Sequence, residues 1–512
     1  MLEGCGIEIY AAVMKPKHRT TPLLWPVFAI LIALLPVATW AEGPATSLRP
    51  VLRPGSVPPP GAEDLLGKIG LSGEFGFVLY DMASGKIVEE RNATKPVTPA
   101  SVTKVITALY ALDHLGADYR FSTQVLGTGT IENGMLQGDL ILLGGGDPTL
   151  DTDRMLTLVR RLRDLGLRQI SGRFLVNGAS LPMFREIDTQ QPVYVGYNPA
   201  ISGLNLNFNR VYFEWKRNAS GYSTSMDARG QKIVPQIRSA TIKIVDRAAP
   251  LFAVTNGNGV ENWTVMKSAL GNGGGRWLPV RDPNRYAADT FREIARSQGI
   301  TLPTPEFSNT ANGRLLAADT SAPLQDVMRD MLVHSTNLTA EVLGLAASQK
   351  AGVTVNSLRQ SASHMTSWAQ TRLGMMNSVF YDHSGLSDKT KVTARDLIAA
   401  LTRARGIDTN FDQRLKTIRP RTAKGDLDPA SPATILAKTG TLNFVSALSG
   451  YLTVPSGQNY AFAMFGQDLT KRRAADNVAN ELPAGAQSWN ARARTLQQGL
   501  LYRWARLGDV TN

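Results

Sequence analysis

The sequence predicts an α+β fold that is interrupted along the chain by a mostly β insertion. Apolar runs on both sides of a short turn, as in GFVLYDMASGKIVEE, are typical of antiparallel strands. Three more strand-like runs, ATILAKTGTL, SALSGYLTV and YAFAMFG, lie near the other end of the 512-residue chain. Between about residues 121 and 305, short strand-like runs alternate with Gly, Asn and Asp turns, and helical stretches are few. We therefore expect one domain built from both ends of the chain, with the insertion between them.

The first 41 residues have the layout of a secretory signal peptide. A basic stretch precedes an apolar run over residues 23–37, and the small residues Thr39 and Ala41 favour cleavage after Ala41. The alternative is an uncleaved membrane anchor, which the shortness of the apolar run disfavours. Met14 is an alternative start, because the residues before it add nothing that such a signal needs.

Residues 42–62 follow this leader and are rich in proline, which predicts an extended linker. Cys5 is the only cysteine and lies within the leader, so a cleaved chain has no disulfide, thiol nucleophile or cysteine–metal site. Export without disulfides is typical of a bacterial envelope protein. We therefore expect the protein in the periplasm or cell envelope of a bacterium.

The net charge of +13 predicts attraction to anionic polymers or membrane surfaces. The simpler explanation is that the positive charge keeps the protein soluble and has no specific partner. A peripheral contact with a membrane is left open. No run of lysine and arginine is interleaved with aromatic residues, which disfavours nucleic-acid binding. The sequence also leaves open whether the protein forms a homodimer.

The stretch TPASVTKVITAL, residues 98–109, places Ser101 and Lys104 three residues apart on an expected helix that ends at Gly116. A serine hydroxyl is a weak nucleophile unless a neighbour takes its proton, which a lysine does only when its pKa falls. Burial or nearby positive charge lowers that pKa, and the helix N-terminus supplies part of the positive potential. Its N–H groups can also hold an oxyanion. Taken alone, the pair is better explained as a solvent-facing pair on an amphipathic helix.

Ser335, Thr336 and Asn337 form an S-x-N tripeptide at a break between two helical stretches. We expect Ser335 to relay a proton in the reaction of Ser101. Asn337 can orient Lys104 and hold a substrate amide. Like the first motif, this tripeptide is common by itself. It indicates a function only together with the first motif and with the third motif described next.

Lys438, Thr439 and Gly440 form a KTG tripeptide within a strand-like run. Because Gly440 has no side chain, an extended substrate can approach the strand edge and pair with it. Lys438 brings positive charge, and the hydroxyls of Thr439 and Thr441 can bind a substrate carboxylate. The three motifs in this order, behind a leader, therefore indicate a serine hydrolase.

S-x-x-K followed by S-x-N and KTG is the motif set of penicillin-binding proteins and serine β-lactamases. The long separation of Ser101 from Ser335 resembles the low-molecular-mass class C penicillin-binding proteins, the D-alanyl-D-alanine carboxypeptidase/endopeptidase family. GDLILLGGGDPTL, ISGLNLNFN and HSGLS are secondary matches, so the resemblance covers nearly the whole mature chain. It implies a DD-peptidase/serine β-lactamase-like domain, an antiparallel sheet flanked by helices, over residues 63–122 and 306–512. A mostly β module over residues 123–305, with room for two nested subdomains, would separate the first motif from the second.

The same resemblance implies an acyl-enzyme mechanism on peptidoglycan stem peptides. Ser101 would attack the bond between two D-alanines or a D-amino-acid cross-link, with Lys104 as the general base. The N–H groups of Ser101 and Thr441 would form the oxyanion hole, and Asn337 and Ser335 would support proton transfer. β-Lactam antibiotics would acylate Ser101 as substrate mimics, and the chemistry requires no metal or organic cofactor. The balance of carboxypeptidase and endopeptidase activity stays open.

Two positions depart from the family pattern. His383 stands where glycine is usual in the D-G-S-G-L-S stretch, and Asp388 stands where arginine is common. That stretch borders the pocket for the substrate side chain in relatives, so the preferred stem-peptide residue is left open. We expect His383, like His334, to be a local hydrogen-bonding residue rather than a catalytic base.

Two other functions are compatible with these motifs. A serine β-lactamase shares the acylation step but releases the drug adduct quickly. One route to fast release uses a glutamate-activated water, and no glutamate lies between Glu341 and Lys438. A non-catalytic cell-wall-binding protein on the same fold is the second alternative, which the three intact motifs disfavour.

Two features of the insertion resemble sites for other chemistry. GGGDP at residues 144–148 invites a phosphate-loop interpretation, but no G-K-[S/T] follows, and we expect a tight turn. Asp147, Asp151 and Asp153 lack the EF-hand pattern, which disfavours a structural calcium site.

Overall fold

The computed structural model describes residues 61–422, 426–429, 431, 433–475 and 480–506. The predicted signal peptide at residues 1–41 and most of the predicted linker lie outside the described residues. The described part begins with α1 (Ala62–Ile69), a helix that the sequence analysis did not predict. None of the described helices has the length and apolar character needed to cross a membrane.

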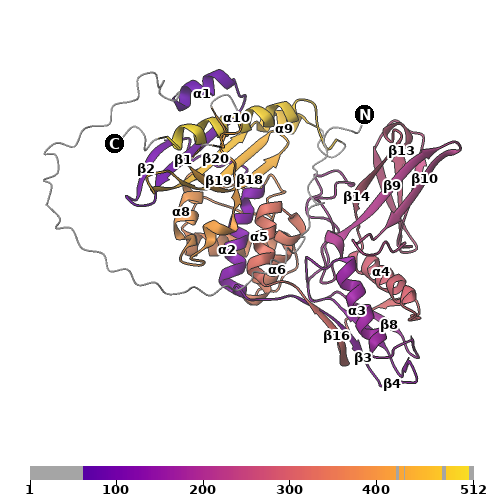
Figure 1. The fold of residues 1–512 in the computed structure, drawn as a ribbon. Helices are drawn as coiled ribbons and strands as arrows, with labels where there is room; N and C mark the ends of the chain where they lie inside the picture. Colours follow the sequence, from indigo (N-terminus) through magenta and orange to yellow (C-terminus); the bar gives the residue numbers. More distant parts are fainter. Residues whose placement is uncertain (1–60, 423–425, 430, 432, 476–479, 507–512) are drawn as a thin grey trace, which may run out of the picture.

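One antiparallel sheet is built from both ends of the described chain (Figure 1). Its strand order is β17, β18, β19, β20, β1, β2. The strands are β17 (Lys416–Thr417), β18 (Thr434–Leu442), β19 (Val445–Thr453), β20 (Asn459–Gln467), β1 (Glu74–Asp81) and β2 (Lys86–Arg91). The predicted hairpin and the three predicted C-terminal strands are confirmed, and β1 joins them through its antiparallel pairing with β20.

Helices cover both faces of this sheet (Figure 1). On β20, Ala461 and Ala463 lie in the core with helices of one face, whereas Phe462 and Met464 lie in the core with the helices of the other. Alternate residues of a strand point to opposite faces, so a strand covered on both sides is apolar throughout. The first face carries α2 (Thr103–Leu115), α5 (Leu324–His334), α6 (Asn337–Lys350), α7 (Leu358–Trp368) and α8 (Ala394–Ala404). The second carries α1 and α10 (Ala486–Trp504), and a short helix α9 (Leu469–Ala474) follows β20.

The central helix α2 is buried along most of its length. Its apolar residues pack against α5, α6 and α7 in the larger core. The helix ends at Gly116, whose N–H donates to the carbonyl of Leu112 and whose φ of 84° suits a residue without a side chain. The predicted end of this helix is therefore confirmed.

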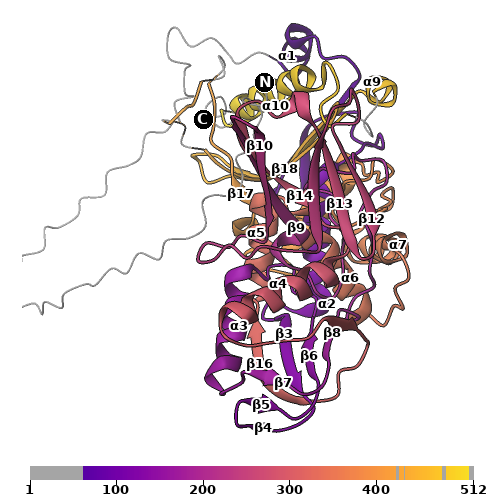
Figure 2. The ribbon, with the colours of Figure 1, turned by 90° about the vertical axis from the view of Figure 1, so that its right-hand side faces the viewer.

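The inserted part forms a separate lobe beside this domain, with a five-stranded sheet at one end and two three-stranded sheets at the other (Figures 1 and 2). The five-stranded sheet has the order β15 (Pro305–Phe307), β8 (Phe174–Asn177), β6 (Leu140–Leu143), β3 (Ser122–Gly127), β16 (Arg314–Thr320). The three-stranded sheets are formed by β9 (Arg210–Asn218), β10 (Gly221–Asp227) and β14 (Gly273–Pro279), and by β11 (Ala240–Val245), β12 (Phe252–Gly257) and β13 (Val260–Met266). Two helices, α3 (Thr152–Asp164) and α4 (Pro283–Ser297), and a small sheet of β4 (Ile131–Glu132), β5 (Met135–Leu136) and β7 (Gln169–Ile170) complete the lobe.

The chain leaves the first domain and returns to it at one point. The N–H of Ser321 donates to the carbonyl of Phe121, and the N–H of Phe121 donates to the hydroxyl of Ser321. Arg120 donates to the carbonyl of Ser321 at 2.8 Å. Strand β16, which ends next to this junction, pairs with β3 of the insertion, although it follows the boundary expected at residue 305. We therefore propose that the inserted module extends to about Thr320.

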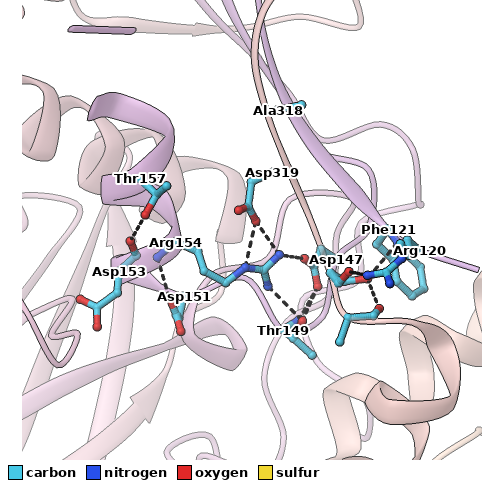
Figure 3. A network of polar contacts seen from close by, with 12 residues as sticks. Arg120, Phe121, Asp147, Thr149, Asp151, Asp153, Arg154, Thr157, Ala318 and Asp319 are labelled. Atoms are coloured by element: carbon cyan, nitrogen blue, oxygen red, sulfur yellow. Dashed lines mark hydrogen bonds and ion pairs between the residues drawn. The ribbon is translucent and has the colours of Figure 1, made fainter. Parts of the chain in front are cut away.

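Asp147 within GGGDP and the two aspartates that follow bind three different sets of groups, and Figure 3 shows those of Asp147 and Asp151. Asp147 is buried, accepts from the N–H and hydroxyl of Thr149, and pairs with Arg154, which also pairs with Asp319 of β16. Asp151 accepts the N–H of Arg154 at 2.7 Å and caps α3, whereas Asp153 accepts two backbone N–H groups near residue 231. These carboxylates therefore fix α3 against the edge of the sheet.

Candidate functional site

Three segments that are far apart in the sequence meet where α2 begins. Ser101 lies on a tight turn, Ala100–Val102, immediately before α2, and Lys104 lies in the first turn of the helix. Ser335 ends α5 and Asn337 begins α6, as the predicted break between two helices requires. The side chains of the first two motifs are in contact, because the Nζ of Lys104 lies 2.7 Å from the Oδ1 of Asn337.

Strand β18 supplies the third segment, Lys438 to Thr441. Thr439 and Thr441 are exposed on the same face of the strand, whereas Lys438 and Gly440 are buried. On one side of β18, strand β17 pairs with Leu436 and Ala437 and then ends. From Lys438 onward, β19 is therefore the only described strand that pairs with β18, and the other edge of β18 is open. An open strand edge of this kind can accept an extended peptide.

Lys104 is fully buried and contacts three oxygen atoms. Its Nζ lies 2.9 Å from the Oγ of Ser101, 2.7 Å from the Oδ1 of Asn337 and 2.7 Å from the carbonyl oxygen of Ser384. A neutral amine has two hydrogens and one lone pair, and the two carbonyl oxygens can only accept. The lone pair is therefore directed at the hydroxyl of Ser101, which is the geometry a general base needs.

Burial is the main cause of the lowered pKa of Lys104. Loss of hydration lowers its pKa from 10.5 to about 7, while the carboxylates of Asp382 and Glu341 act in the opposite direction. We expected the positive potential of the helix N-terminus to contribute to this shift. In the structure, desolvation of the fully enclosed ammonium is the largest cause of the lowered pKa.

The turn that carries Ser101 is strained and tightly covered. Ala100 has a φ of 47°, which a residue with a side chain adopts only when its surroundings hold it there. A Cβ on Gly440 would lie 2.6 Å from the carbonyl oxygen of Pro99 and 3.1 Å from the N of Ser101. The glycine of the KTG tripeptide therefore lets β18 approach the turn of Ser101, in addition to the substrate access for which we expected it.

Lys438 is also enclosed and is linked to the second motif. Its Nζ donates to the Oγ of Ser335 at 3.0 Å and to the carbonyl of Thr439 at 2.7 Å. Burial, followed by the charge of Lys104, lowers the pKa of Lys438 well below its ordinary value. The charged ammonium that we expected here is therefore disfavoured in the free protein. Ser335 has a left-handed φ of 64°, which ends α5 and turns its hydroxyl toward Lys438.

Two buried carboxylates that the sequence analysis did not select hold the loop beside Lys104. Glu341 accepts the N–H groups of His383 and Ser384, and Asp382 accepts those of Gly385 and Ser387. Burial raises the pKa of both carboxyl groups. Together they orient the loop so that the carbonyl of Ser384 reaches Lys104.

The position of Glu341 beside Asn337 could have been recognised from the sequence. Glu341 follows Asn337 by four residues at the start of α6, so the two side chains share one face of that helix. Asp382 stands at the head of the DHSGLS stretch, which the sequence analysis used only as a resemblance. Neither pattern reveals that the side chains are buried against Lys104.

The two residues that depart from the family pattern have structural partners. His383 is fully buried, its Nε2 lies 2.7 Å from the Oγ of Ser361, and burial lowers its pKa to about 3. The expectation that His383 is a local hydrogen-bonding residue is therefore confirmed. Asp388 accepts from the buried guanidinium of Arg472 at 3.2 Å, and that same side chain donates to the carbonyl of Asn443, just beyond the KTG strand.

Comparisons with known proteins agree on one family. Residues 64–487 match the model of the family described as D-Ala-D-Ala carboxypeptidase 3 (S13). The D-alanyl-D-alanine carboxypeptidase DacB of Haemophilus influenzae is 25% identical over 443 residues, which cover 78% of this chain and 87% of the relative. The D-alanyl-D-alanine carboxypeptidase of Actinomadura sp. (strain R39) is 26% identical over 473 residues, covering 80% and 83% of the two chains.

A solved structure shares the fold. The crystal structure of penicillin binding protein 4 from Haemophilus influenzae matches with a TM-score of 0.68 at 21% identity, covering 86% of this chain and 99% of that chain. The likeness confirms the predicted fold class, an antiparallel sheet flanked by helices.

Proposed function

This chain belongs to the D-Ala-D-Ala carboxypeptidase 3 (S13) family, and we propose that Ser101 is the nucleophile of its serine DD-peptidase activity on peptidoglycan. The observation that carries this assignment is the contact of the Ser101 hydroxyl with Lys104 at 2.9 Å. Because the amine is buried and its other two partners are carbonyl oxygens, its lone pair is available only to Ser101.

Acylation begins when Lys104 takes the proton of the Ser101 hydroxyl. The Oγ attacks the carbonyl carbon of the penultimate D-alanine, and the N–H groups of Ser101 and Thr441 hold the resulting oxyanion. Collapse of this intermediate breaks the peptide C–N bond. The proton held by Lys104 passes to the leaving amine with the support of Ser335 and Asn337, so Lys104 is neutral again.

Deacylation repeats these steps with water in place of Ser101. A water molecule gives one proton to Lys104 and its oxygen attacks the acyl ester. The ester bond breaks, Ser101 regains the proton from Lys104, and the shortened stem peptide leaves with a new carboxylate. No step requires a metal or an organic cofactor.

Strand β18 is the proposed binding site for the end of the substrate. Its open edge from Lys438 onward supports antiparallel pairing with an extended peptide. The exposed hydroxyls of Thr439 and Thr441 are placed to bind the terminal carboxylate. An incoming carboxylate would also stabilise the charged form of Lys438, which burial disfavours in its absence.

We further propose that β-lactams acylate Ser101 and that the protein is exported to the bacterial cell envelope. A structure of penicillin binding protein 4 from Haemophilus influenzae, 22% identical to this chain with a TM-score of 0.68, is of a complex with a β-lactam. A β-lactamase remains the alternative within the same fold. The lifetime of the penicillin adduct separates the two functions, since release within seconds would favour the β-lactamase.

Digestion of purified peptidoglycan tests the proposed function directly. We expect the protein to release free D-alanine from pentapeptide stems, and any endopeptidase activity to convert cross-linked dimers to monomers. Chromatography of the soluble fragments measures both products. Pre-treatment with benzylpenicillin is the control and should remove both activities together, because one serine performs them. Unchanged fragments after digestion by a protein that penicillin labels would contradict the proposal.

The rate of acylation should rise with pH through about 7. Only the neutral amine of Lys104 can accept the proton of Ser101, and the pKa of about 7 sets where that form appears. At pH 5 the second-order rate constant should be about one hundredth of its value on the alkaline plateau. Labelling with a fluorescent penicillin from pH 5 to pH 9 measures the profile, with the unfolding midpoint at each pH as the control. A flat profile would exclude Lys104 as the base.

A further inference from the structure

We propose that residues 185–198 of the insertion, called here the positioning loop, orient the active-site residue Asn337 through the carbonyl of Tyr197. The Nδ2 of Asn337 donates to this carbonyl at 2.8 Å. Tyr197 belongs to the inserted lobe, whereas Asn337 begins α6 of the catalytic domain. The inference rests on the proposed function, because it assigns to the insertion a part in the reaction of Ser101.

The contact decides which way the amide of Asn337 faces. A side-chain amide has one acceptor oxygen and two N–H donors in a plane. Lys104 donates to the Oδ1, and the carbonyl of Tyr197 takes one N–H. In the opposite orientation, the oxygen of Asn337 would face the oxygen of Tyr197, and an N–H donor would face the amine of Lys104. The positioning loop therefore selects the useful orientation and fixes the direction of the second N–H, which is left for a substrate.

The positioning loop is held in shape by a buried asparagine. Asn198 is fully buried, and its Oδ1 accepts the N–H groups of Ile187 at 2.9 Å and Asp188 at 3.0 Å. Its Nδ2 donates to the carbonyl of Asp188 at 2.8 Å. One side chain thus ties the two ends of the loop together, immediately after Tyr197.

A buried arginine supports the same loop from the insertion. Arg281 is 5% exposed, and its guanidinium donates to the carbonyls of Arg185, Val193 and Asn198. The backbone N–H of Arg281 donates to the buried carboxylate of Glu261 at 2.6 Å. A buried guanidinium is costly unless its donors are satisfied. The three carbonyls satisfy the terminal nitrogens of Arg281 and so favour one conformation of the loop, whereas its Nε has no hydrogen-bond partner among the described residues.

A second contact joins the insertion to the other side of the site. Arg276 of β14 pairs with Glu481 at 2.6 Å, and the carbonyl of Glu481 accepts from Asn443 at 3.2 Å. Asn443 immediately follows β18. The insertion therefore contacts the catalytic domain beside both the second and the third motif, which limits movement of the positioning loop away from Asn337.

A double-mutant cycle tests this inference. The four proteins are wild type, Asn198→Ala, Asn337→Ala and the double variant, and the measurement is the second-order rate constant for labelling by a fluorescent penicillin. We expect Asn198→Ala to lower this rate about tenfold in the wild-type background, because a small displacement of a supporting group is costly in a catalytic site. In the Asn337→Ala background the same change should alter the rate less than twofold, because the loop then has no amide to orient.

Three controls make the outcome specific. Gln190→Ala changes an exposed side chain of the same loop and should label at the wild-type rate. Unfolding midpoints are measured for every variant, and if Asn198→Ala is destabilised, the cycle is repeated with Arg281→Lys, which keeps the charge but not the three-carbonyl contact. Equal losses in both backgrounds, or no loss in either, would overturn the inference. Wild-type labelling that depends on Ser101 would leave the proposed function standing in that case.

Discussion

Replacement of Ser101 with alanine is expected to abolish covalent labelling by penicillin and to lower D-alanine release roughly 10⁶-fold. Without the hydroxyl no acyl-enzyme forms, and the remaining rate reflects binding and the oxyanion donors alone. The substitution removes one hydrogen bond to Lys104, which costs about 1 kcal/mol of unfolding free energy, so the fold should survive. Gel fluorescence and chromatography of released D-alanine measure the two effects.

A half-buried serine outside the site provides the matched control for this experiment. Ser363 lies on α7, where its hydroxyl donates to the carbonyl of Arg359 within the same helix. Ser363→Ala should therefore label at the wild-type rate. Persistent D-alanine release by a folded Ser101→Ala protein would show that another residue is the nucleophile.

Replacement of Lys104 with methionine is expected to slow acylation by a factor of about 10² to 10⁴. This is the rate enhancement that a general base usually provides. Methionine fills a similar volume in the buried site but cannot accept the proton of Ser101. The carbonyl oxygens of Asn337 and Ser384 lose a donor, at about 1–3 kcal/mol each, whereas the cost of burying an amine is relieved. Stopped-flow labelling and thermal unfolding separate the loss of rate from any loss of stability.

Two further lysine variants sharpen this test. Lys104→Arg keeps a positive charge but holds its proton at every accessible pH, so it should be as slow as the methionine variant. Lys389→Met alters an exposed lysine on the loop that follows DHSGLS and should label normally. Normal labelling by Lys104→Met would refute the role of Lys104 as the base.

Much of the catalytic domain followed from local patterns in the sequence. The turn between β1 and β2, the end of α2 at Gly116 and the three strands after residue 433 were predicted because turn residues and apolar spacing act over a few positions. Local patterns indicated the N-terminal hairpin and the three C-terminal strands separately. The pairing of β1 with β20 joins them into one sheet. The later end that we propose for the insertion rests on the pairing of β16 with β3, which no local pattern indicates.

The site was indicated by motifs but not by its supporting residues. Each of the three motifs contains the residue types that acyl transfer requires, which is why Ser101, Lys104 and Asn337 could be selected together. Glu341 and Asp382 hold the loop whose Ser384 carbonyl contacts Lys104. The carbonyl of Tyr197 contacts Asn337 directly, and none of these contacts can be read from a local pattern. Long loops separate these residues from the motifs in the sequence. Their positions therefore follow no helical or strand period that could be recognised.

The amino-acid sequence specified which groups could react, since chemistry depends on residue type and on spacing within a helix or strand. The burial of Lys104 and Lys438, which moves both pKa values downward, depends on how separate segments pack. The orientation of the Asn337 amide likewise depends on a loop from the inserted lobe. Desolvation and long-range hydrogen bonds exist only after the chain has folded, and for that reason the tertiary structure, not the motif, sets the protonation and geometry of this site.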